Sequence, residues 1–313
     1  MNPTSNELMI ETRGLTKTFG KFVAVDGLDL KVRKGEIHGF VGPNGAGKST
    51  TLKMLAGAIR TTKGEGFIFG HPLGSIEARR LIGYSPERPS FYGDMTAWDY
   101  LAYMSSLSGM NPEEAQRRTK ELLEWIELTR FYKARVGKFS AGMKQRLSLA
   151  QAMAHRPELL ILDEPTANLD PDGRISLLAK LRQLRNEHDI TILICSHILP
   201  ELEQLVDGVT MIEKGRTVAE DSVQHMKEQI ASNQYVLNTS DNKAMMAALE
   251  GQAGVQEIYL DSDGTIHLTS NDIATLQSRV MEAITRSGVL LKNFGEEQIS
   301  LEDIYRKTMG KGK

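Results

Sequence analysis

The chain has 313 residues, which is enough for one main domain and a smaller second one. It carries 38 Lys and Arg against 40 Asp and Glu, and the resulting net charge of -2 gives no indication of nucleic-acid binding. Its one cysteine, Cys195, excludes an internal disulfide and fits a reducing compartment. The sequence shows no signal-peptide pattern and no run of about 18 apolar residues, so we expect no segment that spans a membrane.

The N-terminal part of the chain contains short apolar runs that predict β-strands, separated by glycine-containing turns. We expect strands at residues 9–15, 23–25, 28–32, 36–41, 67–69 and 82–84, with one helix at 49–58. From residue 97 to about 154 the character becomes helical, which predicts a helical insert within about residues 88–157. Apolar strands return at 159–162 and 190–194, and a helix at 173–187 between them completes a βαβ unit with a parallel sheet.

A second domain begins near residues 218–227, where this pattern breaks, and we divide the chain into residues 1–220 and 221–313. In the second part we expect strands at 234–238, 255–260, 265–269 and 289–294, helices at 243–250 and 272–286, and a last helix at 301–308. The order βαββαβ is typical of a small α+β domain of the ferredoxin-like type. His225 and His267 stand alone there and form no metal-ligand cluster.

A glycine-rich stretch at residues 42–49, GPNGAGKS, fits the phosphate-loop pattern G-x-x-x-x-G-K-S/T. It lies between a predicted strand and a predicted helix, a context that a plain glycine-rich turn does not require. Glycines let successive backbone N–H groups curl around phosphate oxygens, and the helix N-terminus adds its dipole. The predicted phosphate-site residues are Gly42, Pro43, Asn44, Gly45, Ala46, Gly47, Lys48, Ser49 and Thr50. Lys48 is expected to neutralise the β- and γ-phosphates, and the Ser49 hydroxyl to hold Mg²⁺.

Two acidic residues follow the apolar strand at 159–162. Asp163 is predicted to emerge at the carboxyl end of that strand, where ligands bind in open α/β sheets. It is placed to bind Mg²⁺ through water, and Glu164 is placed to polarise an attacking water. An apolar strand followed by an acid is a common string by itself, so its weight comes from its pairing with Lys48.

Kinases and GTPases also contain a phosphate loop and an apolar strand that ends in an acidic residue. Three further motifs distinguish this chain from those classes. Residues 139–143, FSAGM, resemble the signature of ABC ATPases, usually written L-S-G-G-Q. Residues 167–170, ANLD, resemble their D-loop, and His197 resembles their switch histidine. Phe19 resembles the aromatic residue that stacks on adenine, and Val25 is assigned to the same nucleotide site. The resemblance covers about residues 8–218, with the motifs in order.

The resemblance implies an α/β fold of the P-loop NTPase class, of the ABC type, that binds ATP and Mg²⁺. In that family two nucleotide-binding domains face each other head to tail. The signature residues of one copy, here Ser140, Ala141, Gly142 and Met143, then clamp the ATP that Lys48 of the other copy holds. Glu164 would activate the water, His197 would contact the γ-phosphate, and Asp170 would link the two sites.

The sequence departs from the family pattern at several positions. Phe139, Ala141 and Met143 replace Leu, Gly and Gln in the signature, whereas Ser140 and Gly142 remain. Glu87 stands where the family has its Q-loop glutamine, and we expect its carboxylate to reach toward Mg²⁺. These features, with residues 144–146, resemble the branch that serves separate export permeases for drugs, sodium or polysaccharides.

Three functions fit these patterns to different degrees. We expect an ATPase subunit that powers transport, with export as the expected direction, through a separate transmembrane permease. It would act as a homodimer or with a second ATPase subunit, on the cytoplasmic inner face of the membrane. Similar C-terminal extensions suggest that residues 221–313 are dimerising or regulatory. A soluble ABC ATPase acting on ribosomes or nucleic acid is the alternative, although such chains usually carry two nucleotide domains or long coiled-coil insertions. A small-molecule kinase is disfavoured by the signature and the D-loop.

Overall fold

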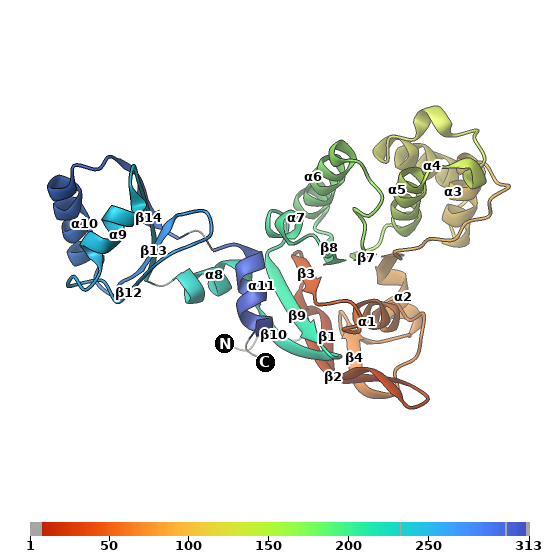
Figure 1. Ribbon diagram of the computed structural model, residues 1–313. Coiled ribbons are helices and arrows are strands. Elements are labelled where there is room, and N and C mark those ends of the chain that lie inside the picture. Colours follow the sequence, from red (N-terminus) through yellow and green to blue (C-terminus); the bar gives the residue numbers. More distant parts are fainter. Residues whose placement is uncertain (1–7, 232, 298, 311–313) are drawn as a thin grey trace. The chain divides into compact units, whose positions relative to one another are not determined.

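The computed structural model describes residues 8–231, 233–297 and 299–310, and they form two compact units (Figure 1). The first unit runs to Val223 and takes up the chain again from Lys307, and the second comprises Gln224–Arg306. Within the described residues no helix is long and apolar enough to cross a membrane.

An antiparallel sheet opens the first unit, with the strand order β2-β1-β4-β5. Its strands are β1 (Leu8–Phe19), β2 (Phe22–Arg33), β4 (Lys63–Ile68) and β5 (His71–Pro72). The sequence predicted two strands at 23–25 and 28–32, but the structure has one, β2. Its register against β1 shifts between the Leu15–Leu28 and Lys17–Val25 pairs, so the polar Asp26 and Gly27 are accommodated by an irregularity and do not end the strand.

A six-stranded sheet carries the predicted βαβ unit, in the order β10-β9-β3-β8-β7-β6. Its strands are β3 (Ile37–Val41), β6 (Ile82–Ser85), β7 (Leu159–Asp163), β8 (Thr191–Cys195), β9 (Gly208–Glu213) and β10 (Arg216–Ser222). Every residue of β3, β7 and β8 is buried, as expected for parallel strands covered on both faces. The edge strand β10 is antiparallel to β9 and was not predicted, because none of its residues is buried and its hydrophobic signal is weak.

The helices of the first unit include a separate helical segment between β6 and β7, grouped together in Figure 1. This segment contains α3 (Ala97–Leu107), α4 (Pro112–Trp125) and α5 (Ala141–Ala152), with short 3-10 turns at Thr129–Phe131 and Val136–Lys138. A capping box formed by Asn111 and Glu114, followed by Pro112, fixes the start of α4. The other helices are α1 (Lys48–Leu55), α2 (Ile76–Leu81), α6 (Pro171–His188) and α7 (Leu199–Glu203).

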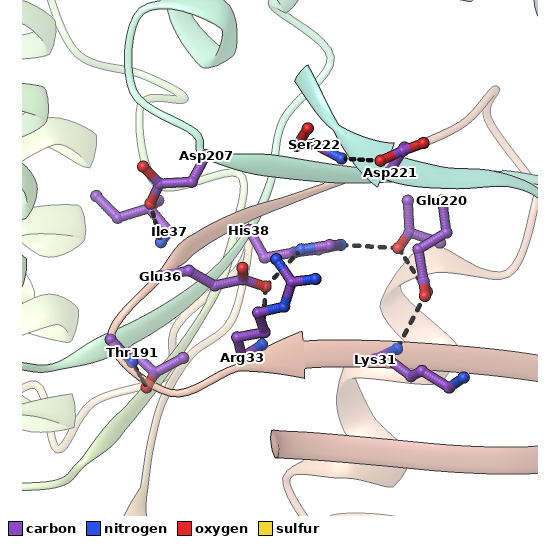
Figure 2. A network of polar contacts seen from close by, with 12 residues as sticks. Lys31, Arg33, Glu36, Ile37, His38, Thr191, Asp207, Glu220, Asp221 and Ser222 are labelled. Atoms are coloured by element: carbon purple, nitrogen blue, oxygen red, sulfur yellow. Dashed lines mark hydrogen bonds and ion pairs between the residues drawn. The ribbon is translucent and has the colours of Figure 1, made fainter. Parts of the chain in front are cut away.

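A polar network, buried at His38 and Thr210, ties the strand β3 to its surroundings (Figure 2). The imidazole of His38 lies 3.0 Å from Glu36 Oε1 through Nδ1 and 2.7 Å from Thr210 Oγ1 through Nε2. Thr210 donates to Glu220 at 3.1 Å, and the same carboxylate accepts the backbone N–H of Lys31 at 3.0 Å. The contacts connect β2, β3, β9 and β10, so both sheets help to fix the strand that leads into the phosphate loop.

The second unit has the predicted order of elements, βαββαβ, after helix α8 (Val223–Ala231). Its elements are β11 (Gln234–Thr239), α9 (Asn242–Leu249), β12 (Glu257–Leu260), β13 (Ile266–Thr269), α10 (Ile273–Ser287) and β14 (Leu291–Glu296), and helix α11 (Leu301–Gly310) follows. The strands pair antiparallel in the order β12-β13-β11-β14. Helices α9 and α10 cover one face of this sheet (Figure 1). There the second unit has a separate hydrophobic core, which includes Leu237, Met245, Ile266, Leu276 and Val280.

A cavity in this second core should destabilise the second unit alone. Leu237 is fully buried, so Leu237→Ala is expected to cost about 2–5 kcal/mol of unfolding free energy. Both tryptophans, Trp98 and Trp125, lie in the first unit, so their fluorescence follows that unit while circular dichroism follows both.

In urea unfolding, Leu237→Ala should shift part of the dichroism transition and leave the tryptophan transition in place. Leu290→Ala, at a side chain that is 73% exposed, is the matched control and should shift neither. An equal shift of the tryptophan transition by Leu237→Ala would show that the two units unfold as one.

Candidate nucleotide-binding site

A cavity of about 520 Å³ opens where β3, β7 and β8 end, as expected at the carboxyl edge of a parallel sheet. Its walls are formed by Phe22, Ala24, Asn44, Gly45, Gly47, Lys48, Ser49, Thr50, Glu87, Asp163, Glu164, Ala167 and His197. The structure therefore brings the predicted phosphate loop together with the predicted acids and histidine. A second cavity of about 560 Å³, lined by Arg118, Trp125 and His188 among others, contains none of the predicted residues.

The phosphate loop is shaped by two glycines that have no room for a side chain. Gly47 has φ 103°, and a Cβ there would lie 2.5 Å from the carbonyl oxygen of Ala24. A Cβ on Gly42 would overlap the carbonyl oxygen of Ile212. The backbone can therefore line the cavity with N–H groups, the donors that a phosphate accepts from.

The side chain of Lys48 folds back onto the start of the phosphate loop. Lys48 Nζ donates to the carbonyl oxygens of Gly42 at 2.7 Å and Pro43 at 3.1 Å. Gly42, Pro43 and Ala46 do not line the cavity, and the Ala46 side chain is buried, so these three shape the loop from behind. The loop and its ammonium group fit a bound triphosphate.

Asp163 is the most buried charged group of the cavity, with 3% of its surface exposed. Burial raises the pKa of its carboxyl, and the negative charges of Glu164 and Glu87 raise it further, while a hydrogen bond from Ser49 and the charge of Lys48 oppose the rise. Carboxylates that repel one another beside a serine hydroxyl are a hard-oxygen donor set that suits a divalent cation.

This donor set is small. The residues that the structure describes contain no group of three or more His, Cys, Asp or Glu side chains arranged to hold a metal by themselves. Mg²⁺ at phosphate sites usually takes only one or two protein carboxylates and completes its shell with phosphate oxygens and water. The set therefore fits Mg²⁺ that arrives with a nucleotide and does not fit a permanent metal cage.

Glu164 and His197 form a pair at the mouth of the cavity. Glu164 Oε2 lies 2.8 Å from His197 Nδ1, and the backbone N–H of Glu164 donates to Cys195 O at 2.9 Å. Glu164 has φ 51°, a left-handed conformation that is uncommon for a residue with a Cβ and often marks a functional position. The histidine side chain is 66% exposed and the glutamate 13%, so the glutamate points inward while the imidazole remains open to a ligand.

The aromatic side of the cavity differs from the prediction. Phe19 and Phe22 face each other across the β1–β2 turn and both are exposed, but only Phe22 lines the cavity. Lys17 Nζ instead lies 4.9 Å from the centre of the Phe19 ring. The assignment of Val25 to the nucleotide site is corrected, because its side chain is fully buried and packs beneath Gly47.

Sequence reasoning missed three wall residues, Phe22, Ala24 and Ala167. A second aromatic three positions after Phe19, on the other side of a predicted turn, was the signal available for Phe22. Ala167 is the first residue of the D-loop-like stretch at 167–170, which was the signal available for it, whereas Ala24 is a small residue in no motif.

The signature residues and Asp170 lie outside the cavity. Ser140 caps α5 by accepting the backbone N–H of Met143 at 3.2 Å, and Asp170 caps α6 by accepting that of Gly173 at 3.1 Å. Ser140, Ala141 and Asp170 are exposed, and neither the signature residues nor Asp170 line the cavity. The predicted site is thus divided within one chain into a cavity and an exposed surface at two helix starts.

The phosphate loop between a buried strand and a helix, with an Asp-Glu pair at the end of a neighbouring strand, defines a P-loop NTPase. The ABC transporter family matches residues 25–167, and the ATP-binding protein DrrA1-3-like C-terminal domain matches residues 222–309.

Similar proteins cover nearly the whole chain. The bacitracin transport ATP-binding protein BcrA of Bacillus licheniformis is 38% identical over 307 residues, 97% of this chain and 98% of its own length. The daunorubicin/doxorubicin resistance ATP-binding protein DrrA of Streptomyces peucetius is 34% identical and covers 96% of this chain and 92% of its own.

Solved structures match about seven-tenths of the chain. An ATP-binding subunit of an ABC transporter superimposes with a TM-score of 0.65 at 29% identity, over 71% of this chain and 93% of its own. A dimeric ATP-binding cassette in a post-hydrolysis state with ADP and Pi has a TM-score of 0.64 at 25% identity. The match covers 69% of this chain and 99% of the cassette.

The chain belongs to the ATP-binding subunits of ABC transporters. The predicted ABC ATPase fold is confirmed, and the chain is an ATP-binding ATPase that powers transport. The relatives support this reading and give no support to action on ribosomes or nucleic acid.

The electrostatics of Asp163 predict a pH-dependent stability. Because its pKa is raised in the folded chain, protonation favours folding, and this contribution is fully present below the ordinary aspartate pKa and lost as pH rises through the raised value. Without nucleotide, Asp163→Asn should therefore raise Tm by a few degrees at pH 8, and the gain should shrink as the pH is lowered toward 5.

Differential scanning calorimetry of both proteins across this pH range measures the gain. Asp94→Asn, at a fully exposed carboxylate, is the matched control and should leave Tm unchanged at every pH. If the gain in Tm of Asp163→Asn instead grew toward low pH, the pKa of Asp163 would be lowered and not raised in the folded chain.

Proposed function

We propose that this chain hydrolyses ATP in a Mg²⁺-dependent site that a second copy completes, and that hydrolysis drives export through a separate transmembrane permease. The division of the predicted residues carries the proposal. One chain places Lys48, Asp163 and Glu164 around a cavity but leaves Ser140 and Asp170 on an exposed surface away from it. Head-to-tail pairing of two chains would bring that surface over each cavity, and a solved cassette of the same fold is described as dimeric with ADP and Pi.

The chain's own residues then have distinct tasks. Lys48 and the loop N–H groups bind the β- and γ-phosphates, while Ser49, Asp163 and Glu87 would hold Mg²⁺. When bound, the ion supplies positive charge that neutralises the phosphate oxygens. The repulsion between Asp163, Glu164 and Glu87 is relieved by that charge, so nucleotide and ion bind together more readily than either alone.

Glu164 and His197 act on the reacting atoms. Glu164 accepts hydrogen bonds on the inner side of the cavity and is positioned to orient and polarise a water for attack on the γ-phosphate. His197, held at 2.8 Å by this carboxylate, turns its exposed ring toward the γ-phosphate and stabilises the charge that develops there. Ser140 to Met143 of the second copy contribute the start of α5, a helix N-terminus suited to the same phosphate.

The cargo class follows from the relatives. Their printed names refer to bacitracin transport, linearmycin resistance and daunorubicin/doxorubicin resistance. We therefore infer export of an antibiotic-like amphiphile by a permease that this chain joins at the inner face of the membrane, with the helical segment and the Glu87 loop receiving a cytoplasmic permease helix. Intact Lys48, Asp163, Glu164 and His197 favour a homodimer over pairing with a second ATPase subunit.

The second part of the chain, residues 221–313, is proposed to be a ferredoxin-like domain that dimerises or regulates. Its element order βαββαβ and the strand order β12-β13-β11-β14 support the fold. Its match to the C-terminal domain shared by DrrA-like ATP-binding proteins supports a role common to that group.

Replacing the proposed base tests the hydrolytic mechanism. Glu164→Gln should bind ATP, lose about 10²–10⁴-fold in turnover, and form a dimer that persists only with ATP and Mg²⁺. Phosphate release and analytical ultracentrifugation measure the two effects. Glu158→Gln, at the opposite end of β7, is the matched control and should behave as the wild type. Normal turnover of Glu164→Gln would remove Glu164 from the mechanism.

The transporter partner is tested by affinity capture. The Glu164→Gln chain with ATP and Mg²⁺, added to detergent-solubilised membranes of the source cells, should retain a polytopic membrane protein in stoichiometric amount, identified by mass spectrometry. A Lys48→Ala chain that cannot retain ATP should capture less of it if the complex depends on the closed dimer. Recovery of ribosomal or DNA-bound proteins would support the alternative instead.

A further inference from the structure

A single carboxylate outside the cavity connects the two helices that start at the signature and at Asp170. Glu127 follows α4, and its side chain is 47% exposed. Its Oε2 lies 2.7 Å from Arg146 Nη1 of α5, and its Oε1 lies 3.1 Å from Lys180 Nζ of α6. Ser176, one turn before Lys180 on the same helix, donates to Oε1 at 3.2 Å.

These contacts favour the ionised form of the Glu127 carboxylate. The hydrogen bond from Lys180 lowers its pKa most, the charge of Lys180 and bonds from Arg146 and Ser176 lower it further, and partial burial opposes them. Its backbone has φ 61°, in the left-handed region that favours glycine. This conformation belongs to the turn that ends α4, where the Leu128 N–H donates to Leu123 O at 2.9 Å, and it fixes the backbone from which the carboxylate reaches its three partners.

The two helix starts that it connects already touch each other. A Cβ on Gly142 of the signature would lie 3.2 Å from Asn168 O and 3.3 Å from Leu169 Cδ2, so the first turn of α5 lies directly on residues 168–169. Further along, Arg146 Nη2 approaches within 3.3 Å of the Cβ position of Gly173 in the first turn of α6. The contact at the helix starts and the Glu127 cluster therefore hold α5 and α6 at two separate points.

We propose that Glu127 is a positioning residue for ATP hydrolysis, which locks the starts of α5 and α6 into one preformed surface that a second copy receives. The inference rests on the proposed composite site, because that surface carries Ser140 to Met143 and Asp170. A surface whose parts are fixed in advance loses less conformational freedom on pairing than two independently moving loops. Ion pairs at exposed positions stabilise a fold little, so the expected effect of Glu127 is on dimer geometry and not on unfolding.

The dimer of the Glu164→Gln chain is the readout that separates these effects. In that background, Glu127→Gln should raise the dimer dissociation constant with ATP and Mg²⁺ roughly tenfold, as expected for loss of a coupled charge network. Affinity of the monomer for a fluorescent ATP analogue should not change, since Glu127 does not line the cavity. Glu124→Gln, on the same turn of α4 with one contact to Lys120 at 4.0 Å, is the matched control and should match the parent.

A second variant separates positioning from folding. Glu127→Gly relieves the left-handed backbone and should keep or raise Tm, yet weaken the dimer as much as Glu127→Gln does. Without the Glu164→Gln change, both variants should need higher protein concentration to reach the wild-type plateau of ATPase rate, with KM for ATP unchanged at that plateau.

The outcomes are distinguishable. If the parent Glu164→Gln chain dimerises and the Glu127 variants dimerise equally well, the inference is wrong and the proposed function stands. If the parent does not dimerise, the composite site and the inference fall together. A dimer weakened by both Glu127 variants, with Tm and monomer ATP affinity retained, supports the positioning role.

Discussion

The phosphate loop is wedged between two backbones, and the first unit is arranged around that constraint. On one side the carbonyl oxygen of Ala24 in β2 leaves no space for a Cβ on Gly47, and on the other the carbonyl oxygen of Ile212 in β9 does the same to Gly42. The N–H of Gly215 also donates to Ala46 O at 2.9 Å. The loop therefore depends on both the antiparallel sheet and the six-stranded sheet, which are also joined by the polar network of His38, Thr210 and Glu220 (Figure 2).

The electrostatics of the cavity follow from the same packing. The carboxyl edge of buried parallel strands places Asp163 and Glu164 beside Glu87, and Lys48 is the one lysine or arginine among the described wall residues. Burial raises the pKa of Asp163, and the negative charges of Glu164 and Glu87 raise it further. A triphosphate alone would add negative charge to this edge, so binding together with a divalent cation is the arrangement that the charges favour.

Much of this was accessible from the sequence, for physical reasons that particular elements make clear. Strands β3, β7 and β8 are buried throughout, and apart from His38 in β3 they appear in the sequence as mainly apolar runs, so the residues that follow them could be placed at one edge. Edge strand β10 has no buried residue and β2 contains Asp26-Gly27, so local patterns missed the first and divided the second. The wall position of Phe22, the burial of Val25 and the partners of Glu127 arise from contacts between distant segments, which no local pattern contains.

Helix α5 has two attachments, and under the proposed head-to-tail pairing they determine how its start is presented to a second copy. Its C-terminal half lies close against β6 through small groups, since Ser148 Oγ is 2.9 Å from Ser85 Oγ and a Cβ on Gly83 would overlap Ala152 O. Glu87 follows Ser85 by two residues and lines the cavity, so this attachment lies next to the predicted nucleotide site. The N-terminal half is held by Glu127 and by residues 168–169. The angle at which the signature is presented therefore depends on β6 at one end and on the charged cluster at the other.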